Sequence, residues 1–463
     1  MISLSFLGSS AGVAPLLSRA CTAGLLHIGG QLSLIDCAEG TQRQFLSLRH
    51  RIRQRNESNL LATPSGIRRI PLPLPALSSL KSIFITHMHL DHCMGLPVFL
   101  TYLLCNTRAS SGPLEIFGPP GIRLFIRSIL HQTSTNMWTD AKYRVNELLT
   151  SSDDVTPCEE DDMHSSELIG RDLFCGTDGL WRQLHATSAF DVSAGPIVHR
   201  VPCLGYVFTS HIPSTTQAND SGYSPVPKKI VYLGDTSDPS AIAPLAQGAS
   251  LLVHEATFLD DVLPRPTGKL KSKSKPSSKA PQNVKPVTDG GKSEGVGDED
   301  ILPATPAEPV LPHPSKQTTD GDVPLYHDAI HSPNSGSDKS PPPPDSMRNK
   351  AVTMGHSTAS MAGAFARRID ARALALTHFS SRYRPWNNFV AKEFERHAML
   401  AWNSEDEDFR GVENVLGRGV VASSNSSGSP GEGFQPQERQ VKAVSDFSYV
   451  ELPEDGPGRW TQL

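Results

Sequence analysis

The sequence lacks several features that would place it in a familiar class of protein. It has no apolar run of roughly 18 residues, the length that a membrane-spanning helix needs, so we expect no bilayer span. Its seven cysteines form no CxxC pair, which argues against a thiolate zinc site or a disulfide framework and is typical of a reducing compartment. The net charge of −5 excludes a histone-like binder of polyanions. The opening MISLSFLG lacks the basic flank of a targeting peptide, so we expect the cytoplasm or the nucleus.

Short apolar runs alternate with helical stretches over most of the chain. Uninterrupted, partly β-branched runs are typical of strands that are buried on both faces. Helix-like segments lie at 97–105 and 357–368, and Ser357 or Thr358 is placed to cap the second. This alternation predicts a layered α/β fold. The apolar runs are 83–85, 197–198, 230–233, 251–253 and 374–376.

Changes in composition divide the chain. Proline, lysine and serine dominate residues 263–350, whose only aromatic residue is a tyrosine, so this insert is predicted to be disordered. The folded domain is then formed by residues 1–262 and 351–463, with a smaller polar insert at about 423–439. Residues 145–170 carry eight acidic residues and no lysine or arginine, and we interpret the surrounding stretch, about 140–185, as an exposed acidic excursion.

The motif Thr86-His87-Met88-His89-Leu90-Asp91-His92 is the strongest chemical signal. It follows an apolar strand directly, so a strand end and a helix start would bring its imidazoles and carboxylate together. A single histidine here would favour a satisfied polar turn, but three histidines and one aspartate favour metal ions. Histidine with carboxylate and no thiolate suits zinc, or manganese, in a catalytic role.

Four more apolar strands end in residues that can bind a metal or titrate. Ligands of open α/β sheets bind outside the carboxyl ends of strands, so these side chains are expected to form one site with the motif. Each one alone would more often be an ordinary surface or core residue. The residues are His199, Asp235, His254 with Glu255, and His378.

These residues are sufficient for two cations with a water position left open. Such a pair suits phosphoryl transfer, because that transition state needs charge stabilisation more than covalent help. Asp235 is the anion that could bridge the two cations. The first cation would take His87, His89 and His199, and the second would take Asp91, His92 and His378.

Taken together, these motifs resemble the metallo-β-lactamase superfamily and, more narrowly, ribonuclease Z, over roughly residues 1–262 and 351–453. The resemblance implies a four-layer αβ/βα sandwich with two zinc ions per subunit at one sheet edge. It also implies cleavage of precursor tRNA just after the discriminator base, leaving a 3′-hydroxyl. A single set of metal motifs matches the short form of the family. The closer match lies in residues 36–44, 118–121, 200–206, 254–258 (HEATF) and 355–358 (GHST).

Further roles follow once this resemblance is accepted. Glu255 can orient His356 as a proton donor to the leaving 3′-oxygen, and Asp91 can accept the proton of the water. Asp36 and the helix start at 39–44 would support the metal ligands, with capping and packing as the alternative. Four residues are weaker candidates for substrate contacts: Ser9 and Gly12 in a small-residue turn with Ser10, and Arg19 and Arg382 as phosphate contacts, for which a solvated surface role is the alternative.

The chain departs from the family pattern at three places. The family's basic P-x-K-x-R-N loop is replaced by residues 15–20, PLLSRA, which puts CCA discrimination in doubt. The segment at the position of the tRNA-clamping arm is acidic, and an acidic arm would repel phosphate. The 263–350 insert is also not a family feature; a solvated linker is its simplest interpretation.

Two other functions stay open at this point. One is hydrolysis of a small phosphodiester or ester, such as a cyclic nucleotide, by the same dimetal centre. The other is a non-catalytic, metal-binding RNA-associated protein, which would require a lost ligand or a lost Glu255–His356 pair, and neither is lost. Ribonuclease Z enzymes are often homodimers, so a homodimer is a further expectation from the resemblance.

Overall fold

A computed structural model provides the structure. Its contacts divide the chain into two units, Met1–Leu263 with Pro341–Leu463 and, separately, Pro264–Ser340. The second unit lies outside the described residues, as do most of the predicted 263–350 insert and residues 423–438 of the predicted polar insert. The structure describes residues 2–12, 16, 18–61, 71–107, 112–137, 139–153, 162–211, 227–260, 346–383, 386–404, 439–453 and 458–463.

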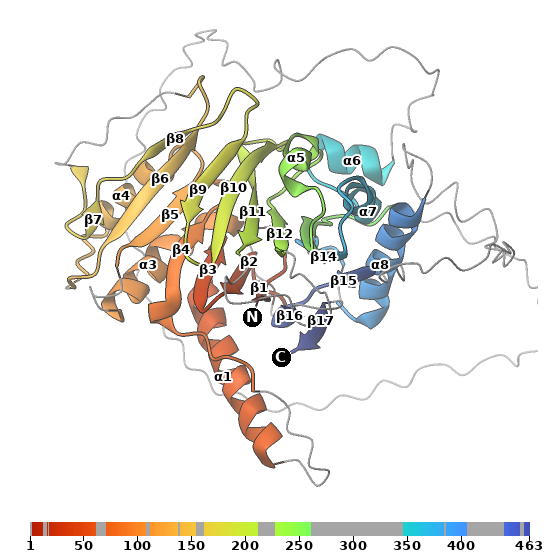
Figure 1. Cartoon of the computed structure of the whole chain (residues 1–463), viewed down its shortest axis with the longest axis horizontal. Helices are drawn as coiled ribbons and strands as arrows, with labels where there is room; N and C mark the ends of the chain where they lie inside the picture. The colour runs from red at the N-terminus through yellow and green to blue at the C-terminus, as the bar shows by residue number, and fades with distance from the viewer. Residues whose placement is uncertain are drawn as a thin grey trace, which may run out of the picture. The chain divides into compact units, whose positions relative to one another are not determined.

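Two β-sheets form the centre of the first unit (Figure 1). In the larger sheet the first strand pairs with a strand near the end of the chain, with Ile2 opposite Leu452. The strand order in this sheet is β17 (Arg459–Gln462), β16 (Ser448–Leu452), β1 (Ile2–Gly8), β2 (Ala23–Ile28), β3 (Gln31–Ile35), β4 (Leu80–Phe84), β5 (Leu114–Gly118), β6 (Tyr143–Leu149) and β7 (Glu167–Leu168), with β8 (Asp172–Phe174) also paired to β6.

The smaller sheet joins parts of the sequence on both sides of the long insert. Its two central parallel strands meet across that insert, with Leu252 opposite Leu374. The strand order is β15 (Gln440–Ala443), β14 (Ala373–Thr377), β13 (Leu251–Glu255), β12 (Lys229–Leu233), β11 (Cys203–Ser210), β10 (Phe190–Ile197) and β9 (Trp181–Ala186).

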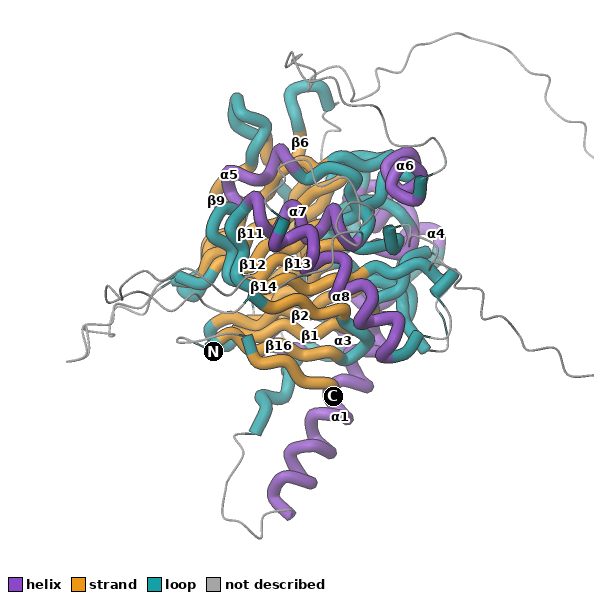
Figure 2. The backbone as a smooth tube through the Cα atoms, turned by 90° about the vertical axis from the view of Figure 1, so that its right-hand side faces the viewer, coloured by secondary structure: helices purple, strands orange, loops and turns teal. Residues whose placement is uncertain are grey.

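Helices cover the outer faces of both sheets, which gives four layers. Figure 2 shows α7 and α8 lying across the strands of the smaller sheet. One apolar core lies between the larger sheet and α1, α3 and α4, a second between the two sheets, and a third between the smaller sheet and α5, α7 and α8. The helices are α1 (Thr41–Leu61), α2 (Leu90–Cys93), α3 (Leu96–Cys105), α4 (Ile122–Gln132), α5 (Ala243–Ala246), α6 (Met347–Thr353), α7 (Ala359–Arg368) and α8 (Asn388–Asn403), with 3-10 turns at Leu77–Ser79 and Ser240–Ile242.

This arrangement confirms the predicted four-layer αβ/βα sandwich, and the five apolar runs each contribute to a strand of the two sheets. Thr358, one of the two predicted caps, caps α7 by accepting a hydrogen bond from the Met361 amide. Among the described residues, no helix is both long enough and apolar enough to cross a membrane.

The predicted acidic excursion at 140–185 is wrong for the part that the structure describes. Residues 143–149, 167–168, 172–174 and 181–185 lie in β6, β7, β8 and β9. The acidic side chains find cations outside their own segment: Arg123 lies 3.4 Å from Glu147, and Arg127 lies 2.8 Å from Glu167. Both arginines belong to α4, so the local absence of basic residues does not indicate exposure. The most acidic part, 154–161, lies outside the described residues.

The C-terminal boundary of the predicted insert also moves. The prediction placed residues up to 350 in the insert, but α6 begins at Met347. Ser346 caps this helix by accepting a hydrogen bond from the Asn349 amide at 3.2 Å. A serine cap followed by good helix formers overrides the composition of the preceding segment.

Candidate metal centre

Strand direction explains why distant residues meet at one edge of the smaller sheet. The strands β12, β13 and β14 are parallel, so their carboxyl ends lie together. The strand β10 runs the same way as β12, because both are antiparallel to β11. The end of β4 in the other sheet is fastened there by two hydrogen bonds, from the Leu204 amide to the Thr86 carbonyl at 3.0 Å and from the Tyr206 hydroxyl to the Ile85 carbonyl at 2.8 Å.

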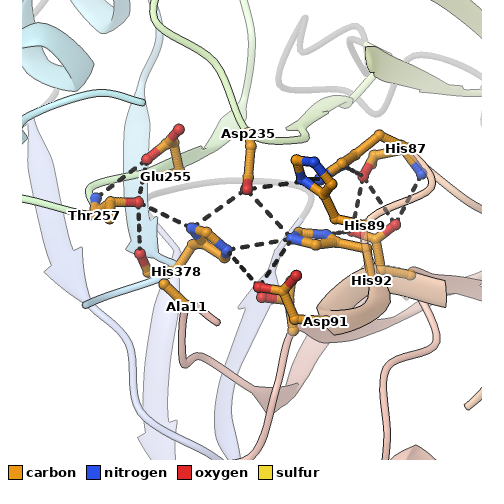
Figure 3. A network of polar contacts seen from close by, with 12 residues as sticks. Ala11, His87, His89, Asp91, His92, Asp235, Glu255, Thr257 and His378 are labelled. Carbon is orange, nitrogen blue, oxygen red and sulfur yellow. Dashed lines mark hydrogen bonds and ion pairs between the residues drawn. The ribbon is translucent and has the colours of Figure 1, made fainter. Parts of the chain in front are cut away.

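All seven predicted ligand side chains lie in this one place (Figure 3 shows six of them). Their ligand atoms form overlapping groups within which all atoms lie within 4.8 Å of one another. His356 belongs to a third such group with Asp235 and His378. The first two groups are His87, His89, His199 and Asp235, and Asp91, His92 and His378.

Asp235 lies between the two groups. One carboxylate oxygen, Oδ2, faces His87 at 3.7 Å and His199 at 3.9 Å. The other oxygen, Oδ1, faces His92 at 3.4 Å and His378 at 3.3 Å. The Oδ1 atom is buried and has no hydrogen-bond partner within the described part of the chain. A buried carboxylate oxygen without a partner is costly unless a cation or proton satisfies it.

The spacing of the ring nitrogens also fits a metal. The Nδ1 atom of His89 lies 3.0 Å from Nε2 of His87 and 3.2 Å from Nε2 of His199. Two imidazoles can share one hydrogen bond, but three converging nitrogens cannot all be satisfied that way. Ligand atoms around a tetrahedral zinc ion, at bond lengths of about 2.0–2.1 Å, lie about 3.3 Å from one another. The histidine and aspartate groups are therefore suited to hold a metal ion.

The three imidazoles of the first group have the protonation state that a metal requires. Burial lowers the pKa of His87 well below its ordinary value and lowers the pKa of His199 to about 4. Burial also lowers the pKa of His89. These three rings are thus neutral near pH 7 and can offer a lone pair without first losing a proton.

Asp36 joins the HxHxDH segment to the first sheet. Its carboxylate accepts hydrogen bonds from the Thr86 amide at 2.8 Å and from Nδ1–H of His92 at 2.8 Å. The second bond fixes His92 with Nε2 turned toward Asp235 and His378. This contact agrees with the supporting role predicted for Asp36.

One residue on each side of the long insert contacts a further predicted ligand. The carbonyl of Gly355 accepts a hydrogen bond from Nδ1–H of His199 at 2.6 Å. The hydroxyl of Thr257 lies 3.0 Å from Nδ1 of His378. Partners of this kind orient metal-binding imidazoles and increase their basicity.

The backbone is strained at two of these positions. Asp36 and His378 both have a φ of 58°, in the left-handed region. A residue with a Cβ atom typically loses about 1–3 kcal/mol there, and such strain persists where the surroundings over-determine the geometry. Here each residue follows its strand and turns its side chain toward the metal site.

Glu255 and His356 form a pair beside the metal groups. Nδ1–H of His356 donates to Oε1 of Glu255 at 3.0 Å, and the Thr236 amide donates to the same oxygen at 2.7 Å. Burial lowers the pKa of His356, but the Glu255 carboxylate outweighs that effect and raises the pKa to about 9. The imidazole is therefore charged near pH 7 and can give up a proton.

The predicted substrate contacts fare differently. Gly12 lies at the site, but its amide donates to Oδ2 of Asp91 at 2.7 Å. Ser9 is buried, and its hydroxyl donates to Asp446 at 3.0 Å. Arg19 is only 1% exposed, bonds the Ser380 carbonyl at 3.2 Å and stacks on Trp386 at 4.8 Å, which is a structural position.

Arg382 differs from the other three candidates because it is exposed, with its guanidinium 4.7 Å from the Phe258 ring. Sequence reasoning missed Arg200, which is exposed and whose charge lowers the pKa of both His89 and His356. Its position next to His199 was the available signal. It also missed Asp446, which no local pattern marks.

Comparison with known proteins decides the family. No family model matches the chain. The chain is 31% identical to the ribonuclease Z of Pseudomonas putida over 301 residues, which cover 57% of this chain and 75% of that protein. The chain belongs to the ribonuclease Z family. The recognition from the sequence motifs is thus confirmed, and as a family member the chain is a metal-dependent hydrolase.

Relatives in this family extend over most of the chain. The human zinc phosphodiesterase ELAC protein 1 is 28% identical over 430 residues, which cover 89% of this chain and 95% of that protein. The crystal structure of human tRNase Z, short form, aligns with a TM-score of 0.49 at 21% identity and covers 97% of this chain and 99% of that one.

Proposed function

We propose that the chain is a zinc-dependent endoribonuclease that removes the 3′ trailer from precursor tRNA and leaves a 3′-hydroxyl on the tRNA. The observation that carries this proposal is the position of Asp235, whose two oxygens face two separate groups of ligand atoms. A carboxylate placed in this way suits a bridge between two cations. The Glu255–His356 pair at its side supplies a proton where a leaving group would need one.

In this proposal two zinc ions, or manganese ions, bind at the two groups. His87, His89 and His199 would hold the first ion, Asp91, His92 and His378 would hold the second, and Asp235 would bridge them. When bound, two such cations supply charge stabilisation to the phosphoryl group in an in-line displacement.

The side chains then manage the protons. Water attacks the phosphorus atom of the scissile phosphodiester, and Asp91 accepts its proton; the Gly12 amide orients the Asp91 carboxylate at 2.7 Å. The bond between phosphorus and the 3′-oxygen breaks, and the phosphate stays on the trailer. His356, held by Glu255, donates its proton to the departing 3′-oxygen, which leaves as a hydroxyl group.

The test combines metal content with cleavage. Elemental analysis of the purified protein should find two zinc ions per chain, and a precursor tRNA should be cut to a product whose 3′ end accepts enzymatic tailing. Dialysis against a chelator should remove both metal and activity. For substitutions of the site histidines, His131→Ala is the matched control. His131 is exposed on α4, so this variant removes an imidazole that lies outside the site. A metal-loaded protein that leaves every precursor intact would contradict the proposal.

A second candidate is hydrolysis of a small phosphodiester by the same centre. The absence of lysine and arginine from residues 145–170 favours it, because RNA binding relies on cationic side chains and this segment supplies none. Competing hydrolysis of bis-p-nitrophenyl phosphate against cleavage of precursor tRNA separates the two. A small-substrate kcat/KM far above the value for RNA would favour the second candidate.

A further inference from the structure

Helix α1 concentrates positive charge in an acidic protein. Over Thr41–Leu61 it carries five arginines and one glutamate, whereas the chain has a net charge of −5. Its buried side is short: Phe45, Leu48 and Ile52 are the apolar side chains that pack into the core. In Figure 1 the C-terminal half of α1 extends away from the sheets. The arginines are Arg43, Arg49, Arg51, Arg53 and Arg55.

One face of α1 lines a groove of about 1180 Å³. The residues on this face recur at intervals of three and four, as expected for a single side of a helix. The opposite wall is formed by Leu16, residues 18–20 and residues 445–447. We call this cavity the α1 groove. The helix residues lining it include Arg43, Ser47, His50, Arg51 and Gln54.

The cations of the α1 groove are available to a ligand. The Arg43 side chain is 80% exposed, and its pairing with Glu39 at 3.5 Å is a surface contact that contributes little. Arg51 is oriented by the Phe447 ring at 4.2 Å and by the Leu463 carbonyl at 3.0 Å. Its planar guanidinium still has donors left for an anion.

The α1 groove also contains two carboxylates, Glu39 and Asp446. Asp446 is turned toward the protein, where its oxygens accept hydrogen bonds from Ser9 at 3.0 Å, from the Ala20 amide at 2.6 Å and from Gln44 at 3.0 Å. Burial raises its pKa to about 6. The Asp446 carboxylate is thus already hydrogen-bonded to the protein at one wall of the groove.

A single loop separates the α1 groove from the metal centre. Its last residues, 18–20, line the groove. Its first residues contact the site, since the Gly12 amide donates to Asp91 at 2.7 Å and the Phe379 amide donates to the Ser9 carbonyl at 2.9 Å. The metal centre and the α1 groove therefore share this segment of the chain.

We propose that the α1 groove binds the sugar–phosphate backbone of the RNA substrate; this rests on the proposed endoribonuclease function. Exposed arginine, glutamine, serine and histidine side chains are suitable donors to phosphate oxygens, and they carry no base specificity. Leu16, Leu46 and Phe447 are the large apolar side chains of this lining, which is too little apolar surface for a membrane or for a hydrophobic peptide. The groove supplies a cationic contact that the acidic segment at 145–170 does not.

The first test measures RNA binding apart from cleavage. The two variants, Arg43→Glu and Arg53→Glu, are made in a His89→Ala background and titrated with fluorescent precursor RNA at several salt concentrations. Arg43→Glu should raise Kd about tenfold and reduce the slope of log K against log salt by about one. Arg53→Glu is the matched control, because Arg53 is exposed on the same helix but does not line the groove. Equal effects of the two variants, or none, would overturn the proposal.

The second test keeps the metal centre intact. Arg43→Glu in the active protein should raise KM for precursor RNA about tenfold, whereas Arg53→Glu should leave that KM unchanged. If RNA is never cut by either protein, the proposed endoribonuclease function fails, while the binding titration still decides the groove. Anionic phosphatidylserine vesicles serve as the competing ligand, and vesicle binding that is lost in Arg43→Glu while RNA binding is retained would refute an RNA groove.

Discussion

The metal centre and the α1 groove differ in how firmly their side chains are held. At the metal centre the imidazoles of His92 and His199 are fixed by hydrogen bonds from their second nitrogens. In the groove, by contrast, Arg43 ends in solvent on a flexible stem. Bond-breaking needs atoms placed within fractions of an ångström, whereas a repeating polyanion is bound by charge that can follow its movements. The protein thus separates rigid chemistry from adaptable binding.

The largest predicted effect tests the rigid side of this comparison. His89→Ala removes an imidazole whose Nδ1 atom lies close to ring nitrogens of both His87 and His199. We expect cleavage to be abolished and zinc content to fall, with the far-UV circular dichroism unchanged because His89 is only half-buried. Cleavage retained at the wild-type rate would show that His89 is not part of the active site.

The next effect concerns the proton donor. His356→Ala should slow cleavage by about 10²–10⁴-fold, the usual contribution of a general acid. Zinc content should stay at the wild-type value, because His356 belongs to neither of the two groups proposed to hold the ions, although it lies beside Asp235 and His378. Single-turnover kinetics with saturating enzyme measures the chemical step. A parallel loss of zinc would instead assign His356 to metal binding.

A smaller effect should come from the backbone behind His199. Gly355 has a φ of +73°, and a Cβ atom there would lie 2.7 Å from Nδ1 of His199. Gly355→Ala should displace that imidazole and weaken zinc binding by about 10–100-fold. Gly248→Ala is a matched control, since Gly248 has a φ of +71° with nothing within 4 Å of its Cβ position. Competition with a zinc-binding dye gives the zinc affinities of both variants. Equal values would show that Gly355 does not position the His199 imidazole.

The smallest effect lies at the loop shared by the two regions. Burial raises the pKa of Asp446 to about 6 from an ordinary value of 3.8. The folded protein then binds more protons than the unfolded chain between these values, so this group lowers the free energy of unfolding by about 2 kcal/mol as pH rises from 4 to 7.

Asp446→Asn should remove that dependence. Urea denaturation of the chelator-treated protein from pH 4.5 to 7.5 measures it as the difference between wild type and variant. Two curves that stay parallel across this interval would contradict the raised pKa. Cleavage should change little, because Asp446 contacts the loop and not the metal ligands.

The sequence predicts the layers and the proposed metal ligands because both predictions depend on short, local patterns. Apolar runs mark buried strands, and the seven ligand residues follow four of them directly. The features that the sequence does not reveal are those that depend on backbone conformation or on partners far away in the chain. The Gly355 carbonyl and the left-handed φ of His378 leave no trace in residue type. Arg123, which neutralises Glu147, lies in another segment. The composition around Glu147 therefore did not reveal this partner, and the stretch was predicted to be an exposed acidic excursion.

The pairing of β13 with β14 across the long insert has a consequence for the way a cell makes this protein. A nascent chain that has left the ribosome as far as Glu255 already holds every proposed ligand except His378, and it also lacks His356. The strand β1 likewise waits for a neighbour that is translated long after it, since Ile2 pairs with Leu452. A polypeptide that stops within the long insert therefore lacks β14 beside β13 and two residues of the proposed site, so hydrolysis becomes possible only after the segment beyond the insert has been translated.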